Sequence, residues 1–162
     1  MLVDYQTLSD NSKVWIYPSS RKFYPNEIEP LSEEISNFLT NWKQEEEAIA
    51  CHFKLHYNRI LVITTTGEAL LNTTTINQLV AFIIQLQEQY EVQLLDKMNV
   101  CFKQGEHVQY KDLKTFKELI KSKAVNKNNI VFDNMVSSKL DFENYWEVPA
   151  SESWYGNLFK KK

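Results

Sequence analysis

Residues 50–66, ACHFKLHYNRILVITTT, predict two β-strands joined by a tight turn at residues 57–58. In the first half, apolar residues alternate with three polar ones, His52, Lys54 and His56. That alternation is typical of a strand with one buried and one wet face, and we expect an edge strand. The second half, RILVI at 59–63, is apolar on both faces and predicts a central strand.

Working outward, VWIY at 14–17 also lacks polar alternation and predicts another central strand. Between these strands lies a helical pattern, with Asn26 expected as N-cap and Glu29 completing a capping box. A second helix is expected after Thr74 or Thr75 as cap, and KMNVCFK follows as a strand. The order to residue 103 predicts a ferredoxin-like βαββαβ core, a mainly antiparallel sheet with helices on one face.

Residues 104–162 predict an extension that packs on this core. It begins with a hairpin turning at Gly105, followed by a helix at 112–123 and a strand in NNIVFDNMV. Two short helical turns divided by Pro149 complete an aromatic tail. We expect one α+β domain over 1–162, with 1–103 as its core, because no polar or low-complexity stretch separates two domains.

Composition excludes several classes of protein. The chain has 162 residues and 43% hydrophobic content, enough for one globular domain. Its longest apolar run, LVAFII, is far shorter than the roughly 18 residues of a membrane span. The first ten residues lack the positive charge and apolar run of a signal peptide, so we expect a cytoplasmic protein without membrane partners. The two cysteines are expected as buried thiols.

The net charge of −3 is unevenly distributed. Residues 27–47 hold seven glutamates and one lysine, whereas residues 103–127 hold seven lysines against three acids. Four of these lysines share one face of the expected third helix: Lys111, Lys114, Lys117 and Lys121. The face could bind phosphate or RNA, but a solvated helix surface is favoured, and nucleic acid is not an expected partner.

Sequence motifs for nucleotide binding are missing. The three glycines are far apart, so neither GxxxxGK[ST] nor GxGxxG occurs, and ATP hydrolysis is not supported. His52 and His56 are four residues apart, which on a strand is roughly 13 Å, too far for one zinc ion. We expect no metal, no cofactor and no catalytic residue.

Arg21 and Arg59 are the two arginines and could each grip a carboxylate or phosphate. On the expectation that their strands run parallel, they lie at opposite rims of the sheet. Arg21 with Asp133 and Asn134 is therefore the candidate ligand pocket. The alternative for Arg21, a structural salt bridge, is favoured.

The aromatic tail supplies candidate interaction residues, Trp146 and Trp154. Tryptophan and tyrosine dominate interface hot spots, so these side chains could anchor a partner. Because large exposed aromatic patches are uncommon, we favour a lid that closes over the protein's own sheet.

The stretches SKVWIYPSSR, LLDKMNV, VFDNMV and WEVPASESW resemble a family of Bacteroidota proteins of about this length, often labelled "ABC transporter ATPase". The resemblance runs along the whole chain, and WEVPASESW is its most specific part. The family has no P-loop to support that label and implies no established activity. Where members carry Cys-Ser-Ile-Asp, residues 74–77 of this chain read TTIN, without the thiol and the carboxylate.

These observations favour a non-catalytic binding or interaction protein with an unknown protein or small-molecule partner. A small-ligand pocket or small enzyme around Arg21, Asp133 and Asn134 is the first alternative. Weak RNA binding by the lysine face is the second.

Overall fold

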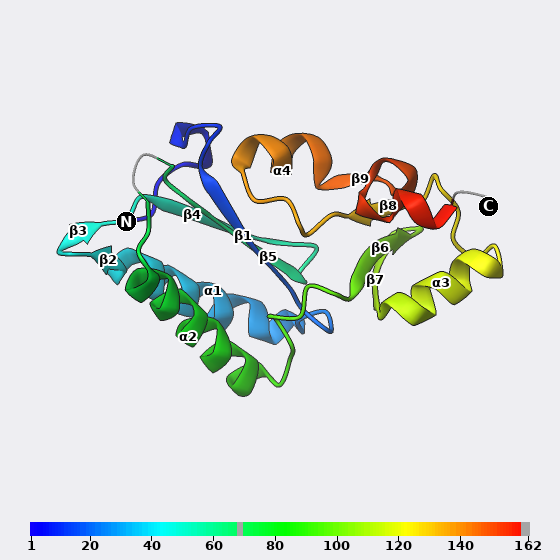
Figure 1. The fold of residues 1–162 in the computed structure, drawn as a ribbon. Coiled ribbons are helices and arrows are strands. Elements are labelled where there is room, and N and C mark those ends of the chain that lie inside the picture. Colours follow the sequence, from blue (N-terminus) through cyan, green and yellow to red (C-terminus); the bar gives the residue numbers. More distant parts are fainter. Residues whose placement is uncertain (68–69, 160–162) are drawn as a thin grey trace.

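The structure, a computed structural model, describes residues 1–67 and 70–159. Two main antiparallel sheets lie beside each other, with helices around them (Figure 1). The first sheet has the order β1 (Lys13–Pro18), β5 (Ile60–Thr65), β4 (Cys51–His56). The second has the order β7 (His107–Lys111), β6 (Val100–Gln104), β8 (Ile130–Phe132), β9 (Glu147–Pro149). The α-helices are α1 (Pro25–Asn41), α2 (Thr73–Tyr90), α3 (Leu113–Lys121) and α4 (Lys139–Tyr145).

Several short elements complete the described chain. The strands β2 (Lys43–Gln44) and β3 (Glu47–Ala48) form a small hairpin after α1. The 3₁₀ helices are η1 (Tyr5–Thr7), η2 (Ala150–Glu152) and η3 (Trp154–Phe159). None of the helices in the described ranges has the length and apolar character needed to cross a membrane.

The hairpin predicted at 50–66 is confirmed. Its two strands pair antiparallel with Leu55 opposite Leu61. Tyr57 and Asn58 form the turn with φ values of 57° and 52°, the left-handed conformation that two-residue hairpin turns use. The strand β4 lies at the sheet edge and β5 in the centre, as the sequence predicts.

The strand β1 lies at an edge of the first sheet, so its predicted central position is wrong. It is nevertheless buried on both faces, because other segments of the chain pack on these faces and along its unpaired edge. Its free edge is met by residues 137–138: Val14 donates to the carbonyl of Ser137 at 2.9 Å, and Lys13 bridges to Ser138.

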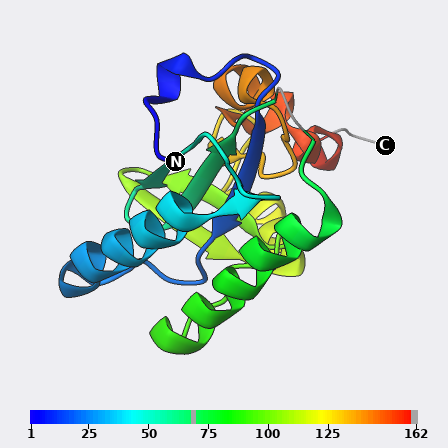
Figure 2. The same cartoon turned by 90° about the vertical axis from the view of Figure 1, so that its left-hand side faces the viewer.

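The two long helices cover one face of the first sheet, as predicted (Figure 2). Their apolar stripes meet alternate residues of the strands, among them Tyr17, Leu61 and Ile63. The helix starts differ from the prediction. The helix α1 begins at Pro25, where Glu27 accepts from the Tyr24 amide at 2.7 Å; Asn26 and Glu29 are not its caps. For α2 the cap is Asn72, not Thr74 or Thr75.

The strand β6 does not join β1. Instead it pairs with β7 and β8 in the second sheet, so the four-stranded ferredoxin-like sheet is not confirmed and the fold is α+β in the broader sense. The reason is local pairing: β6 forms a hairpin with β7 through Gly105, which has φ +60°, while residues 137–138 occupy the β1 edge. The strand β9 was not predicted, and Pro149 ends it. Helical turns lie on both sides of Pro149, α4 before it and η2 and η3 after it, as predicted.

The two sheets share a hydrophobic core on the face of the first sheet that α1 and α2 leave open. It contains Val14, Ile16, Ile60 and Val62 of the first sheet with Cys101, Phe132 and Trp146 of the second half. On its other face the second sheet buries Phe116 of α3 and Tyr155 of η3. Both faces of β1 and β5 are therefore covered.

Candidate functional site

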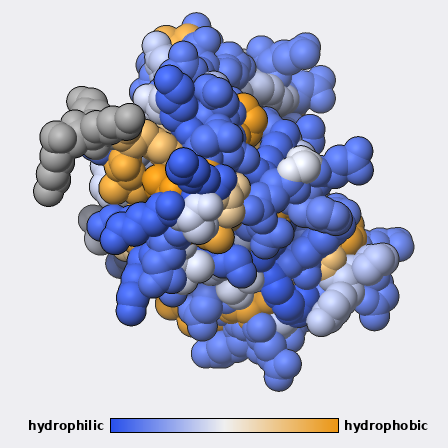
Figure 3. All heavy atoms as spheres, turned by 90° about the vertical axis from the view of Figure 1, so that its right-hand side faces the viewer, coloured by the Kyte–Doolittle hydropathy of each residue, from blue (hydrophilic) through white to orange (hydrophobic). Residues whose placement is uncertain are grey.

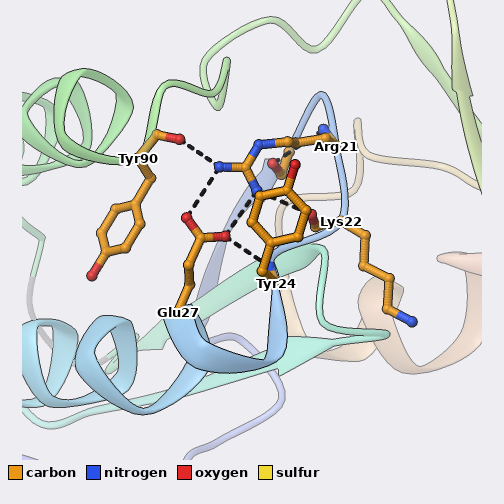
Figure 4. Close-up of polar contacts among 6 residues, drawn as sticks. Arg21, Lys22, Tyr24, Glu27 and Tyr90 are labelled. Carbon is orange, nitrogen blue, oxygen red and sulfur yellow. Dashed lines mark hydrogen bonds and ion pairs between the residues drawn. The ribbon is translucent and has the colours of Figure 1, made fainter.

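Arg21 is held in a structural ion pair at the end of the first sheet (Figure 4). Its guanidinium donates to both carboxylate oxygens of Glu27, at 2.9 and 3.1 Å, and to the Tyr90 carbonyl at 2.6 Å. The ring of Tyr24 lies 4.5 Å from the guanidinium carbon. The hydrogen bond from Arg21 is the main cause that lowers the pKa of Glu27. These contacts match the favoured salt bridge.

Asp133 and Asn134 have partners of their own. The Asp133 carboxylate accepts from the backbone of Met135 and Trp154. The Asn134 side chain is buried, and its oxygen accepts from the Trp146 indole at 2.8 Å. No hydrogen bond or ion pair within the described ranges joins either residue to Arg21. The proposed three-residue pocket thus finds no support in these contacts and stays a prediction.

Arg59 lies at the same end of the first sheet as Arg21, because β1 and β5 run antiparallel with Pro18 opposite Ile60. The predicted placement at opposite rims is therefore wrong. Arg59 donates to three backbone carbonyls, those of Ser19, Ser20 and Val108, at 3.1, 2.9 and 2.6 Å. Burial lowers the pKa of its guanidinium. Because Val108 belongs to β7, this side chain ties the two sheets together.

The two tryptophans proposed as interaction residues differ in exposure. Trp146 is 4% exposed and packs against Phe132 and Phe142 with ring centroids 4.9 and 4.7 Å apart. It therefore forms part of the cover over the first sheet, as the lid hypothesis expects, and has no surface for a partner. Trp154 is 56% exposed and remains a candidate contact.

The lysine face of α3 is exposed, as expected for an amphipathic helix. Lys111, Lys114, Lys117 and Lys121 are all exposed, and Phe116 on the opposite side is buried. Figure 3 views this end of the molecule and shows a mainly hydrophilic surface with separate small apolar areas. No described contact distinguishes these lysines from a solvated surface.

A pocket that the sequence did not reveal lies on the open side of β4. It has a volume of about 360 Å³, near the lower end of the range for small-ligand sites, roughly 300–1,000 Å³. We call it the histidine pocket and define it by its lining residues: Tyr5, His52, Lys54, His56, Val62, Thr64 and Phe142. Its floor is the first sheet, and its walls come from η1 and α4, which lie on this side (Figures 1 and 2).

The strand register brings the polar side chains of the histidine pocket together. His52 lies opposite Thr64, and Lys54 lies opposite Val62. Directly opposed residues on one face have Cβ atoms about 5 Å apart, and positions two apart on a strand point to the same face. The side chains of His52, Lys54, His56 and Thr64 therefore project from one small area of the sheet.

Three of these side chains have donor groups without a protein acceptor. Within residues 1–67 and 70–159, no hydrogen bond or ion pair uses the Lys54 ammonium, the His56 ring nitrogens or the Thr64 hydroxyl. Thr64 is only 1% exposed. No fully buried side-chain nitrogen or oxygen in these ranges lacks a hydrogen-bond partner, so the Thr64 hydroxyl is not an unsatisfied core group but reaches the surface of the pocket that it lines.

The imidazole of His56 is neutral at pH 7. Burial and the nearby Lys54 charge lower its pKa from 6.5 to about 4. The rings of Phe142 and Trp146 pack against it, with centroids 5.8 and 4.8 Å away. A neutral imidazole offers one N–H donor and one acceptor nitrogen.

The wall of the histidine pocket is held by α4. The buried Lys139 donates to the carbonyls of Tyr5 and Leu8 at 3.1 and 2.6 Å. The Tyr5 hydroxyl donates to Glu143 at 3.0 Å. These bonds fasten the segment that carries η1 onto α4, so both walls of the pocket are positioned by contacts more than 130 residues apart in sequence.

A second, more open hollow adjoins the histidine pocket and shares Lys54, His56 and Phe142 with it. Its acidic groups are Glu143 and Glu147. Glu147 forms an ion pair with Lys103 and accepts from the Tyr57 hydroxyl at 2.6 Å. The negative charge of Glu147 is thus compensated by Lys103. Among the described residues, Glu143 has one hydrogen-bond partner, the Tyr5 hydroxyl.

Scans against protein-family models, curated proteins and solved structures found no match for this chain. The resemblance to the Bacteroidota family is therefore neither supported nor refuted. No group of three or more His, Cys, Asp or Glu side chains in the described ranges could hold a metal ion.

Proposed function

We propose that this protein is a non-catalytic binding protein and that its ligand site is the histidine pocket. The supporting observation is the convergence of three donors without protein acceptors, on Lys54, His56 and Thr64, in one cavity. Apolar surface flanks them, from Val62 in the floor and Phe142 in the wall. Small-molecule sites typically combine such walls with a few placed polar groups.

The sheet architecture supports this location. In a split βαβ arrangement both helices pack on one face and leave the other open, and this is the face that ferredoxin-like domains often use for binding. We infer that residues 13–90 form a unit of this kind. The strand β6, which would be its fourth strand, pairs instead with β7 and β8 in the second sheet. The second half then covers the β1 side of the open face and leaves a pocket at β4.

Binding without catalysis is favoured by the pocket chemistry. No cysteine, serine or carboxylate lines the histidine pocket. A nucleophile–base pair requires two side chains within hydrogen-bonding reach, and the described residues give no hydrogen bond between Thr64 and either histidine. ATP hydrolysis has no support, since the sequence lacks the phosphate-binding loop.

Amide chemical-shift mapping tests the proposal on the full chain. A mixture of one-ring fragments with acidic, basic and neutral head groups is added at millimolar concentration to ¹⁵N-labelled protein. We expect shifts at the lining positions in β4, β5 and α4, and none at the exposed lysines of α3. Shifts confined to the surroundings of Arg21, Asp133 and Asn134 would favour the alternative pocket. Absence of any shift at the histidine pocket would overturn the proposal.

A further inference from the structure

We infer that the ligand of the histidine pocket is a small organic monoanion, a carboxylate carried on a flat apolar body of one or two rings. The inference rests on the proposed function and names the ligand class of that same site. It follows from the balance of donors, charges and apolar surface around the cavity.

The head group is an acceptor because the pocket offers mainly donors. Lys54 carries three N–H donors and Thr64 one O–H donor, and none has a protein acceptor among the described residues. His56 can add one N–H. A carboxylate has two oxygens that accept several hydrogen bonds at once, so it can satisfy these groups together.

The charge of the ligand is limited to one. Lys54 is the one lysine or arginine among the lining residues, and His56 is neutral at pH 7. The lining includes no arginine, although arginine is the usual residue for bidentate phosphate binding. The Glu143 charge in the adjoining hollow disfavours further negative charge. A phosphate dianion would therefore leave one charge uncompensated.

The body of the ligand is apolar and flat. Val62 forms part of the floor, while the rings of Tyr5 and Phe142 form the walls. A volume of about 360 Å³ leaves space for one or two rings. Aromatic surfaces stack with about 0.5–1.5 kcal/mol beyond the burial of area.

Affinity measurements with four phenyl compounds separate head-group charge from ring binding. The probes are phenylacetate, phenethylamine, phenethyl alcohol and phenyl phosphate, each titrated into the full chain by NMR. We expect phenylacetate to bind most tightly, at least fivefold tighter than the alcohol, since one net hydrogen bond is worth about 1 kcal/mol. If the alcohol or the amine binds in the pocket as tightly as phenylacetate, the monoanion inference is wrong while the proposed function stands. If phenyl phosphate binds tightest, the single-charge argument is wrong.

Two charge variants give opposite expected effects on phenylacetate. Lys54→Gln should weaken binding about fivefold, the scale for an exposed charge pair, whereas the control Lys117→Gln on α3 should not change it. Glu143→Gln keeps an acceptor for Tyr5 and removes a neighbouring negative charge, so binding should tighten up to about threefold. Equal affinity for phenylacetate in Lys54→Gln, Glu143→Gln and wild type would refute the placement of the carboxylate.

Two neighbouring threonines provide the matched test of the hydroxyl. Thr64→Val removes the unpartnered donor with little change in shape, so phenylacetate binding should weaken about fivefold with stability unchanged or raised. Thr65 points to the opposite face, where its hydroxyl accepts from the Trp15 indole at 3.1 Å. Thr65→Val should therefore lower the unfolding midpoint and leave the dissociation constant unchanged. The reverse pattern would overturn the role of Thr64.

Discussion

Acidification should destabilise this protein through one histidine. His56 is held neutral by burial beneath the rings of Phe142 and Trp146 and, to a smaller extent, by the Lys54 and His52 charges, while Glu147 opposes them. Its pKa falls from 6.5 to about 4 on folding. Between these two values the unfolded chain binds a proton that the folded chain does not, so the free energy of unfolding must decrease as the pH falls.

The size of the effect follows from the same two values. A difference of 2.5 between 6.5 and about 4 corresponds to about 3 kcal/mol when the pH lies below both, at about 1.4 kcal/mol per pKa unit. Most of this loss occurs between pH 6.5 and pH 4. From pH 7 to pH 5 the linkage relation gives about 2 kcal/mol.

Urea unfolding at pH 7, 6 and 5 measures the loss in wild type and in His56→Gln. Carboxylates titrate in both proteins, so the difference between the two curves isolates this imidazole. Wild type should lose about 2 kcal/mol more than His56→Gln between pH 7 and pH 5. The matched control, His107→Gln on the exposed end of β7, should follow wild type. A constant difference between wild type and His56→Gln, or an NMR titration of His56 centred near 6.5, would refute the reasoning.

Other predictions concern stability and reactivity. Arg59→Met should lower the free energy of unfolding by about 3 kcal/mol, because three backbone carbonyls lose a buried donor. Arg21→Met should lower it by only about 1 kcal/mol, since the ion pair of Arg21 is partly exposed. Urea denaturation of the two variants and wild type measures both effects. Trp146→Phe should cost about 1–3 kcal/mol by leaving a buried amide oxygen unpaired, with Trp154→Phe as a near-neutral control. Both cysteines are buried and burial raises the pKa of each thiol, so a chromogenic disulfide reagent should modify them only after unfolding.

Most of the secondary structure could be predicted from local sequence patterns. The hairpin at 50–66, both long helices and the β6–β7 hairpin follow from alternation, helical spacing and turn residues, and all are confirmed. The N-caps of α1 and α2 were predicted at the wrong residues, because several polar residues near each helix start could act as an N-cap. For α1 the cap interaction is a carboxylate, Glu27, that reaches back to the Tyr24 amide, and Arg21 competes for the same group.

Partner choice among strands could not be read from the sequence. Whether β6 pairs with β1 depends on which edge is free. Residues 137–138, far along the chain from β1, cover that edge through Val14 and Lys13. The antiparallel pairing of β1 and β5 is the same kind of non-local information. This pairing brings Arg21 and Arg59 to the same end of the sheet. There Arg21 pairs with the Glu27 carboxylate, whereas Arg59 donates to backbone carbonyls.

The candidate site was hidden for a related reason. The alternation of His52, Lys54 and His56 indicates a polar face, and water is the simplest neighbour for such a face. Only the fold places Tyr5 and Phe142 over it. The resulting pocket joins three distant parts of the chain, and no spacing rule within one segment could have predicted it.

The pair Thr64 and Thr65 shows what distinguishes a site from a core in a chain without recognisable motifs. Both are 1% exposed, and they occupy adjacent positions of one central strand. On the helix-covered face the Thr65 hydroxyl has the Trp15 indole as partner, so its burial is compensated. No hydrogen bond within the described ranges uses the Thr64 hydroxyl, and since no fully buried side-chain nitrogen or oxygen there lacks a partner, this hydroxyl is open to the pocket that it lines. A hydroxyl that faces the pocket can bond to water or to an acceptor on a ligand, whereas valine at that position could do neither. The exposed Lys54 ammonium beside it also has no protein acceptor among the described residues, so two donors lie next to each other in the pocket that we propose as the binding site.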